Sequence, residues 1–373
     1  MDADTIAEQV RMCASCPKMC RHVCPTFFAW RSDSPTPHGR ALLIHQEGIG
    51  VRDIDERGIE VLYQCLQCSH CLTWCVPEID IAEIVESTRE RLVSEGKYLS
   101  GLNEIRDSIQ RNHNPFNEDH SKRTAWLKKS KSGLKKILYF SGCTASYRES
   151  SISEATFEIL ESLDYDVIVS SEEWCCGSPL LRTGFRDAAL EQARHNVELL
   201  NSIDADEIVA SCPGCYKTLS NDYANEGLEL NKPVKHISQL LANSLQAVEN
   251  AKTKERITFH DPCHLGRHMG EYEAPRTVIE KVTGTSTIEM DRTKENTTCC
   301  GNGAGVRTLF PDQASKIGRS RIDDALGVDA SILVTSCPFC KNMLKSQANN
   351  AIRVLDLPEL VVEFRNSREK KTD

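Results

Sequence analysis

The sequence Cys212-Pro213-Gly214-Cys215 has a counterpart 125 residues later in Cys337-Pro338-Phe339-Cys340. Each motif closes a longer unit, in which a single cysteine and then a Cys-Cys-Gly triplet come before it. Equivalent cysteines of the two units are 120, 124 or 125 residues apart, which indicates an internal repeat. The first unit contains Cys143, Cys175, Cys176, Cys212 and Cys215, and the second contains Cys263, Cys299, Cys300, Cys337 and Cys340.

Short apolar runs stand before the cysteine motifs in both units, and segments with helical periodicity separate them. The apolar runs cover 137–140 and 208–210 in the first unit and 257–259 and 332–334 in the second, and the helical segments cover 187–200 and 312–325. Because strand, cysteine turn and helix alternate, we predict two tandem, pseudo-symmetric α/β lobes whose strands end at the cysteine turns.

The N-terminal part of the chain has a different pattern. Helical spacing of apolar residues between 79 and 93, followed by Gly96, predicts a helix. We therefore expect an all-helical domain at 1–115, a basic linker at 116–136, and the two lobes at 137–250 and 251–373. The helical part holds two cysteine groups, Cys13-x2-Cys16-x3-Cys20-x3-Cys24-Pro25 and Cys65-x2-Cys68-x2-Cys71-x3-Cys75-x-Pro77.

Four closely spaced cysteines ending near proline are typical of a [4Fe–4S] cubane site, in which three thiolates bind one cluster and the fourth binds its neighbour. The group at 65–77 has this spacing, whereas the group at 13–25 has one extra residue between its second and third cysteines. Two structural zinc sites are the alternative, because four thiolates also satisfy tetrahedral Zn²⁺. The crossover rule assigns one cubane to Cys13, Cys16, Cys20 and Cys75 and the other to Cys65, Cys68, Cys71 and Cys24.

The composition excludes several classes of protein. The chain has 373 residues, 18 cysteines, 40% hydrophobic residues and a formal net charge of −9, which argues against a disordered chain and against a general nucleic-acid binder. We find no secretory signal and no apolar stretch long enough to cross a membrane, so we expect a cytoplasmic protein. In that compartment, clustered cysteines more often bind metal or carry out redox chemistry than form disulfides.

Five cysteines in each repeat exceed the four ligands that one cubane or one zinc ion needs. A thiolate shared between two irons would account for the excess. Gly177 and Gly301, directly after the Cys-Cys pairs, are expected to adopt positive φ in a sharp turn. Pro213 and Pro338 are expected at helix entrances, where the helix dipole favours an anionic thiolate.

With these motifs, the two repeat units resemble the CCG (cysteine-rich) domains of heterodisulfide reductase and its relatives. The front part resembles the helical two-cluster ferredoxin module that is fused to such domains or associates with them. From residue 10 to about residue 360, the chain looks like the D-type subunit of heterodisulfide reductase, which is equivalent to the C-type and B-type subunits joined. The resemblance accounts for all 18 cysteines.

In that family, each complete CCG unit can hold a noncubane [4Fe–4S] cluster whose halves share bridging thiolates. The resemblance therefore implies two noncubane clusters, one on each set of five repeat cysteines, besides the two cubanes. It also implies an oxidoreductase in which the cubanes deliver electrons. The ten repeat cysteines would form the catalytic centre and would reduce or form a disulfide such as coenzyme M–coenzyme B.

A second class of function stays open, because the iron–sulfur subunits of glycolate, lactate and glycerol-3-phosphate dehydrogenases share this architecture. In that class the chain only passes electrons from a flavoprotein to a quinone or another carrier. Both classes imply partner subunits, either a flavoprotein or a membrane cytochrome or both, through which the chain could sit at a membrane. A zinc-structured scaffold is the third class.

Polar residues beside the cysteine motifs are candidates for hydrogen bonds to cluster sulfur or for ion pairs with an anionic substrate. The candidates are His260, Asp261, Lys217, Lys341, Arg182 and Arg307. The alternative is that His260 and Asp261 cap a loop and that the four basic side chains are solvated.

Two further segments have compositions that suggest a ligand. The loop at 301–305 is glycine-rich, but it follows a cysteine pair rather than a strand, and its G-x-G-x-x-G spacing fails at Val306. We therefore do not assign it to nucleotide binding. The segment 122–136 has seven basic residues and no acidic one. Charge runs usually face water, so a solvated linker is favoured over a basic wall facing an anionic ligand or partner.

Overall fold

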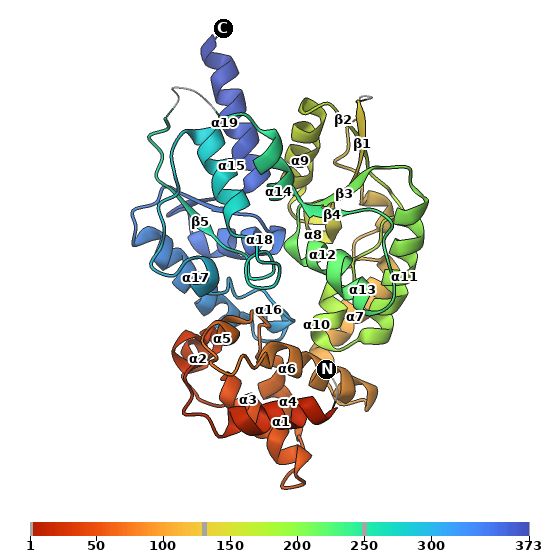
Figure 1. Ribbon diagram of the computed structural model, residues 1–373, viewed down its shortest axis with the longest axis vertical. Coiled ribbons are helices and arrows are strands. Elements are labelled where there is room, and N and C mark those ends of the chain that lie inside the picture. Colours follow the sequence, from red (N-terminus) through yellow and green to blue (C-terminus); the bar gives the residue numbers. More distant parts are fainter. Residues whose placement is uncertain (1–2, 129–132, 248–251, 373) are drawn as a thin grey trace.

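The computed structural model describes residues 3–128, 133–247 and 252–372. It consists of a helical N-terminal region and two regions of parallel β-sheet flanked by helices, and the helical region lies against both of them (Figure 1). The predicted arrangement, helices first and α/β units after them, is confirmed. The predicted boundary at 250/251 and part of the linker, 129–132, lie outside the described residues.

The helical region is built from amphipathic segments with clear start and stop signals. Helix α6 shows this best: the side chain of Asp80 accepts hydrogen bonds from the backbone of Ala82 and Glu83, and Gly96 follows the helix with φ of +75°. The helix buries one apolar face, as its spacing predicts. The helices are α1 (Ala3–Ala14), α2 (Pro25–Trp30), α3 (Pro37–Gly48), α4 (Glu56–Tyr63), α5 (His70–Thr73), α6 (Ile81–Ser94) and α7 (Asn103–Asn112).

The first sheet has four parallel strands in the order β2-β1-β3-β4. The inner strands are buried along 137–140 and 208–210, which suits the apolar sequences of these stretches. The strands are β1 (Lys135–Phe140), β2 (Tyr165–Ile168), β3 (Glu207–Ala210) and β4 (Val234–His236). The helices are α8 (Gly142–Tyr147), α9 (Ser150–Ser162), α10 (Ser178–Thr183), α11 (Arg186–Ser202), α12 (Pro213–Lys217), α13 (Tyr223–Asn225) and α14 (Ile237–Ser244).

The second sheet has three parallel strands in the order β5-β6-β7. The apolar runs predicted as strands form β1, β3, β5 and β6, and the predicted helices at 187–200 and 312–325 are α11 and α17. The strand numbers differ between the sheets, and pseudo-symmetry of the lobes stays a prediction. The elements are β5 (Ile257–His260), α15 (Glu273–Thr283), α16 (Val306–Leu309), α17 (Pro311–Leu326), β6 (Ile332–Thr335), α18 (Pro338–Ala348), β7 (Arg353–Asp356) and α19 (Leu357–Thr372).

The three regions pack on one another. One hydrophobic core contains buried side chains of both sheets, among them Tyr139 and Phe259, together with α19. Helix α9 packs on α19, and α14 packs on α15. The helical region packs on the first sheet region through α6 and α10 and on the second through α2 and α17. Because a parallel sheet brings its strand ends to one edge, this packing sets the cysteine turns of both sheets close together.

The basic segment is not a solvated linker throughout. Arg123 is fully buried and forms an ion pair with the buried Glu173, and Trp126 is 8% exposed in the core shared by the sheets. Lys135 and Lys136 are exposed but begin strand β1. The solvated-linker interpretation is therefore wrong for Arg123 and Trp126. Tertiary packing places Arg123 beside a carboxylate and Trp126 in a hydrophobic core.

None of the helices within 3–128, 133–247 and 252–372 has both the length and the apolar character that crossing a lipid bilayer requires.

Candidate metal centres

The first set of five cysteines lies where the strands of the first sheet end. Cys143 is in α8, directly after β1, and the Cys175–Cys176 pair precedes α10. Cys212 is the N-cap of α12, whose first residue is Pro213 as expected. All five cysteines are buried.

Their thiols interact with one another. Hydrogen bonds with Cys143 and Cys176, together with burial, raise the pKa of Cys175 well above its ordinary value. Hydrogen bonds from Cys175 and Cys215 hold the pKa of Cys176 well below that value. Gly177 turns the chain after the pair with φ of +86°, as predicted. The five sulfur atoms thus form one continuous group.

The second set repeats this arrangement at the end of the second sheet. Cys263 follows β5, and Cys337 is the N-cap of α18, which Pro338 begins. Hydrogen bonds with Cys263 and Cys300 raise the pKa of Cys299 well above its ordinary value. Gly301 has φ of +94°, and a Cβ there would lie 2.5 Å from the carbonyl oxygen of Ala314.

His260 stands at the second set, as one of the sequence hypotheses proposed. One ring nitrogen and the sulfur atoms of Cys300 and Cys340 all lie within 4.8 Å of one another, and all three residues are buried. Asp261, the next residue, accepts a hydrogen bond of 2.9 Å from the backbone nitrogen of Lys294 and pairs with Arg276 at 2.7 Å. Asp261 therefore fits the loop-capping alternative, whereas His260 does not.

In the helical region, Cys13 lies near cysteines of both sequence groups, Cys16 and Cys20 of the first and Cys75 of the second. Burial raises the pKa of Cys13 to about 12, and the charges of Cys20, Cys16 and Cys75 add to this effect. The group Cys13, Cys16, Cys20 and Cys75 is therefore brought together from segments that lie 55 residues or more apart in the sequence.

Cys71 lies near cysteines that the prediction divides between the two clusters, so the assignment of ligands to each cluster stays a prediction. Burial raises the pKa of Cys71 well above its ordinary value, and the nearby charges of Cys20, Cys68, Cys65 and Cys24 raise it further. Cys24 is fully enclosed, which raises its pKa, while the guanidinium of Arg40 and a 3.0 Å hydrogen bond with Thr26 lower it. Arg40 and Thr26 are buried contacts of this group that sequence reasoning missed.

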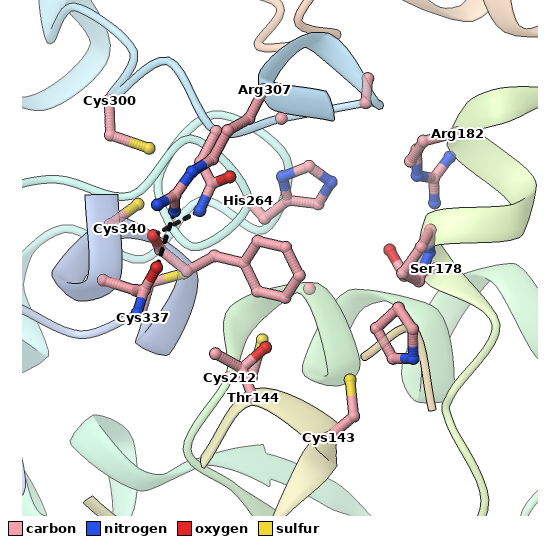
Figure 2. A pocket seen from close by; sticks show the side chains of 18 of the residues that line it. Cys143, Thr144, Ser178, Arg182, Cys212, His264, Cys300, Arg307, Cys337 and Cys340 are labelled. Carbon is pink, nitrogen blue, oxygen red and sulfur yellow. Dashed lines mark hydrogen bonds between the residues drawn. The ribbon is translucent and has the colours of Figure 1, made fainter. Parts of the chain in front are cut away.

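A cavity of about 600 Å³ is lined by both sets of repeat cysteines. All of these cysteines except Cys175 line it, and so do Thr144, Ser178, His264 and Arg307. Figure 2 shows Cys143 and Cys212 on one side and Cys300, Cys337 and Cys340 on the other. Nε2 of His264 is buried and has no partner within the part of the chain that the structure describes.

Three of the four basic candidates have their charge matched by carboxylates. Arg182 pairs with Glu86 and Asp222, Lys217 with Asp222 at 2.5 Å, and Lys341 with Glu149 and Glu359 at 2.8 and 2.6 Å. The hypothesis of solvated side chains is wrong for Arg182 and Lys341, which are 8% and 2% exposed. Their ion pairs leave little charge for a ligand.

Arg307 is different. It lines the cavity and donates a 2.7 Å hydrogen bond to the amide oxygen of Asn342 (Figure 2). Within residues 3–128, 133–247 and 252–372, no carboxylate pairs with it. Arg307 is therefore the basic candidate whose charge is open to an anion in the cavity.

The four cysteine groups are connected. Hydrogen bonding with Cys299 lowers the pKa of Cys68 to about 7, which places the helical region's second group against the second repeat set. Hydrogen bonds with Cys215 and with Cys337 lower the pKa of Cys212, so the two repeat sets also meet. Sulfur atoms therefore follow one another from the helical region through the second set to the first.

The residues fit iron–sulfur clusters. All 18 cysteines lie in the described part of the chain and none of them forms a disulfide. Soft thiolates in groups of four and five suit iron–sulfur clusters. Burial holds Cys13 and Cys20 as neutral thiols, with a pKa of about 12 for each, and a metal would compensate by favouring the thiolate form.

Two comparisons decide the family. Residues 137–220 and 257–345 each match the family described as "CCG: Cysteine-rich domain". The D subunit of the "Dihydromethanophenazine:CoB–CoM heterodisulfide reductase" of Methanosarcina barkeri is 37% identical over 94% of this chain and 92% of its own length. The chain belongs to the heterodisulfide reductase D-subunit family. It is therefore an iron–sulfur oxidoreductase subunit.

Two more distant similarities concern a longer oxidoreductase and a solved structure. An "EtfAB:quinone oxidoreductase" of Syntrophomonas wolfei is 28% identical over 82% of this chain and 47% of its own length. A solved structure of a hypothetical protein from Helicobacter pylori matches the fold with a TM-score of 0.58 and 9% identity, covering 87% of this chain and 67% of that one. This structural likeness concerns the fold alone.

Proposed function

We propose that this chain is the iron–sulfur subunit of a heterodisulfide reductase-type complex and reduces or forms a disulfide in the cavity between the two sets of repeat cysteines. The observation that carries the proposal is that a single cavity is lined by cysteines of both sets. A disulfide has two sulfur atoms, and reducing it consumes two electrons and two protons and yields two thiols. A cavity with thiolate groups on both walls suits such a substrate.

The cysteine groups divide the work in this proposal. Two groups in the helical region would hold cubanes, namely Cys13, Cys16, Cys20 and Cys75, and Cys24, Cys65, Cys68 and Cys71. The sets of repeat cysteines, Cys143, Cys175, Cys176, Cys212 and Cys215, and Cys263, Cys299, Cys300, Cys337 and Cys340, would hold noncubane clusters. When bound, such clusters supply one-electron transfer.

The cavity's own residues would bind and orient the substrate. The guanidinium of Arg307 can accept a carboxylate, sulfonate or phosphate through parallel hydrogen bonds. His264, whose Nδ1 lies 3.4 Å from the sulfur of Cys263 and whose Nε2 is buried without a partner in the described residues, can form a hydrogen bond with the substrate through Nε2. The apolar walls, which include Phe116 and Phe339, exclude water and so strengthen both contacts.

The proposal includes the surroundings of the chain. Electrons would come from a flavoprotein or a membrane cytochrome partner, and the chain would be cytoplasmic, at a membrane only through that partner. The domains would span 1–115, 137–250 and 251–373, joined by the segment 116–136. Relatives of this chain are named as subunits of redox complexes, which supports a partner without naming it.

Metal analysis and a thiol assay test the proposal together. Four [4Fe–4S] clusters predict about 16 iron atoms per chain with a similar amount of acid-labile sulfide. Reduced protein mixed with coenzyme M–coenzyme B disulfide should release both thiols. Little iron with much zinc would refute the clusters. Full iron, no thiol release from this or any related disulfide, and rapid reoxidation by a quinone would refute the disulfide substrate.

An electron conduit is the second candidate. The contacts from Cys68 to Cys299 and from Cys337 to Cys212 favour a path for electrons along the whole molecule. Such a path would also serve transfer from a flavoprotein to a quinone, and one relative is named as a quinone oxidoreductase. Rapid reoxidation by quinone without thiol release would establish this function.

A further inference from the structure

The two repeat sets differ at the residue that ends the strand before the first cysteine. In the first sheet that residue is Phe140, three positions before Cys143, and in the second it is His260, three positions before Cys263. Phe140 is fully buried and His260 is 1% exposed. A phenyl ring offers no hydrogen bond, so only the second set has a side-chain donor at this place.

The orientation of the His260 ring is fixed by Arg321. The Nε of Arg321 donates a 3.1 Å hydrogen bond to Nδ1 of His260. Arginine is always a donor, so Nδ1 must be the acceptor nitrogen and the proton of the neutral ring must be on Nε2. Nε2 is buried and has no hydrogen-bond partner in the described residues. One nitrogen of this ring lies within 4.8 Å of the sulfur atoms of Cys300 and Cys340, and because Nδ1 is bonded to Arg321, Nε2 is the nitrogen available to them.

Arg321 is itself held in place. It is fully buried in α17, and its Nη1 donates to the carbonyl oxygen of Arg292 at 2.9 Å and to the carboxylate of Asp324 at 3.1 Å. The equivalent position of α11, 125 residues earlier, is Asn196, whose amide donates to the carbonyl oxygen of Cys175 at 3.1 Å. The histidine and the arginine therefore occur together in one repeat and are both replaced in the other.

We propose that His260 donates an Nε2–H hydrogen bond to a thiolate of the second set, with Arg321 as the positioning residue that fixes its tautomer, and thereby makes the second cluster easier to reduce than the first. The same tautomer argues against His260 as an iron ligand, because Nε2 carries the proton and has no lone pair to donate. A hydrogen bond stabilises the more negative, reduced state of a cluster.

The consequence is a direction for electrons inside the molecule. Cys68 of the helical region contacts Cys299 of the second set, so electrons would reach that set first and be held there. The inference rests on the proposed second cluster but not on the disulfide substrate. It makes the two repeat sets unequal, although their cysteines correspond one to one.

A redox titration of the full chain, followed by electron paramagnetic resonance, tests this inference. The signal of the second cluster is the one that Cys300→Ser abolishes. His260→Leu should lower its ratio of reduced to oxidised form roughly tenfold at a fixed potential, which is a negative shift of about 59 mV for one electron. His260→Gln keeps an N–H donor, so its potential should lie close to the wild-type value. The matched variant Phe140→Leu should leave the potential of the second cluster unchanged.

The outcomes separate this inference from the proposed function. The inference is overturned if His260→Leu has full iron and the same potential of the second cluster as the wild type. It is also overturned if His260→Gln shifts this potential as far as His260→Leu does. Absence of the second cluster in the wild type overturns the proposed function as well. If the variants do not fold, wild-type protein with ¹⁵N-labelled histidine decides: weak nitrogen coupling to the second cluster is expected. No coupling, or the strong coupling of a direct ligand, overturns the inference.

Discussion

Arg307 is the residue whose substitution best distinguishes a substrate-binding function from electron transfer alone. Three other basic residues form ion pairs with carboxylates of the protein, namely Arg182, Lys217 and Lys341. Arg307 instead forms a hydrogen bond with a neutral amide, and no carboxylate among the described side chains pairs with it. An arginine in a part-buried cavity is desolvated without a counter-charge, and an anionic ligand removes that cost. The spacing of the cysteines carries no information about this difference.

Replacement of Arg307 by glutamine should weaken the binding of an anionic disulfide. A charged hydrogen bond contributes about 1.5–3 kcal/mol, so KM is expected to rise roughly 10- to 100-fold with unchanged iron content. Steady-state thiol release measures KM. Arg353→Gln removes an exposed arginine of β7 that pairs with Glu363 and is the control. An unchanged KM in Arg307→Gln would contradict the role of this guanidinium.

The cysteines at the centre of each repeat should be separable by single substitutions. Cys300→Ser is expected to cost the second set its cluster, about four of about 16 iron atoms, while the cubane signals stay. Cys176→Ser is the matched change in the first set. Iron analysis and electron paramagnetic resonance report both. Loss of every signal in either variant would mean global unfolding instead of a local site.

At the scale of elements, the turn after each Cys-Cys pair sets how a strand, a cysteine pair and a helix meet. Gly177 and Gly301 both have positive φ, but they differ in space. A Cβ at Gly301 would meet the carbonyl oxygen of Ala314 at 2.5 Å, whereas a Cβ at Gly177 would meet that of Ala189 at 3.2 Å. The turn of the second set is therefore packed more tightly against its helix, α17.

Gly301→Ala should accordingly destabilise the second set through both strain and a steric clash. We expect a loss of about 2–4 kcal/mol from the backbone conformation and overpacking combined, seen as a lower apparent Tm and lower iron content. Gly270→Ala, at φ of +72° with no atom within 4 Å of the added Cβ, controls for the backbone effect alone. Equal effects of the two substitutions would rule out the clash.

For the whole molecule, Arg89 is the residue that joins the three regions. It is fully buried in α6, and its guanidinium donates to the carbonyl oxygens of Leu62 at 2.7 Å and Cys65 at 2.9 Å. It also donates to those of Arg182 at 2.6 Å and Ala304 at 3.4 Å. These carbonyls belong to the helical region and to both sheet regions, so one buried side chain donates hydrogen bonds to all three.

Arg89→Leu should remove the hydrogen bonds that a buried guanidinium donates to four carbonyl groups. Each lost hydrogen bond costs about 1–3 kcal/mol, so we expect a loss of at least about 3 kcal/mol and faster proteolysis between the regions. Limited proteolysis and thermal melting of the iron-loaded chain measure this loss. Arg91→Leu, two residues away, removes an exposed arginine that pairs with the half-buried Glu47 and the exposed Glu95, and should cost under about 1 kcal/mol. A similar loss in both variants would contradict the joining role.

Much of the molecule follows from local sequence. Apolar period and turn residues predict β1, β3, β5, β6, α11 and α17, because these signals act over a few neighbouring residues. Cysteine spacing predicts that Cys13 and Cys75 share a cluster; the two residues lie near each other, and their assignment to one cluster stays a prediction. The positive φ of Gly177 and Gly301 follows from the residue type.

Tertiary structure decides the rest, because the missing partners are distant in the sequence. Arg123 is buried because Glu173 lies beside it, and Arg307 stays open because no carboxylate of the described chain reaches it. The cavity exists only where two sheets and a helical region meet. His260 becomes a donor because Arg321, 61 residues away, holds its ring. Spacing therefore determined which metal chemistry is possible, and packing determined which side chains face it.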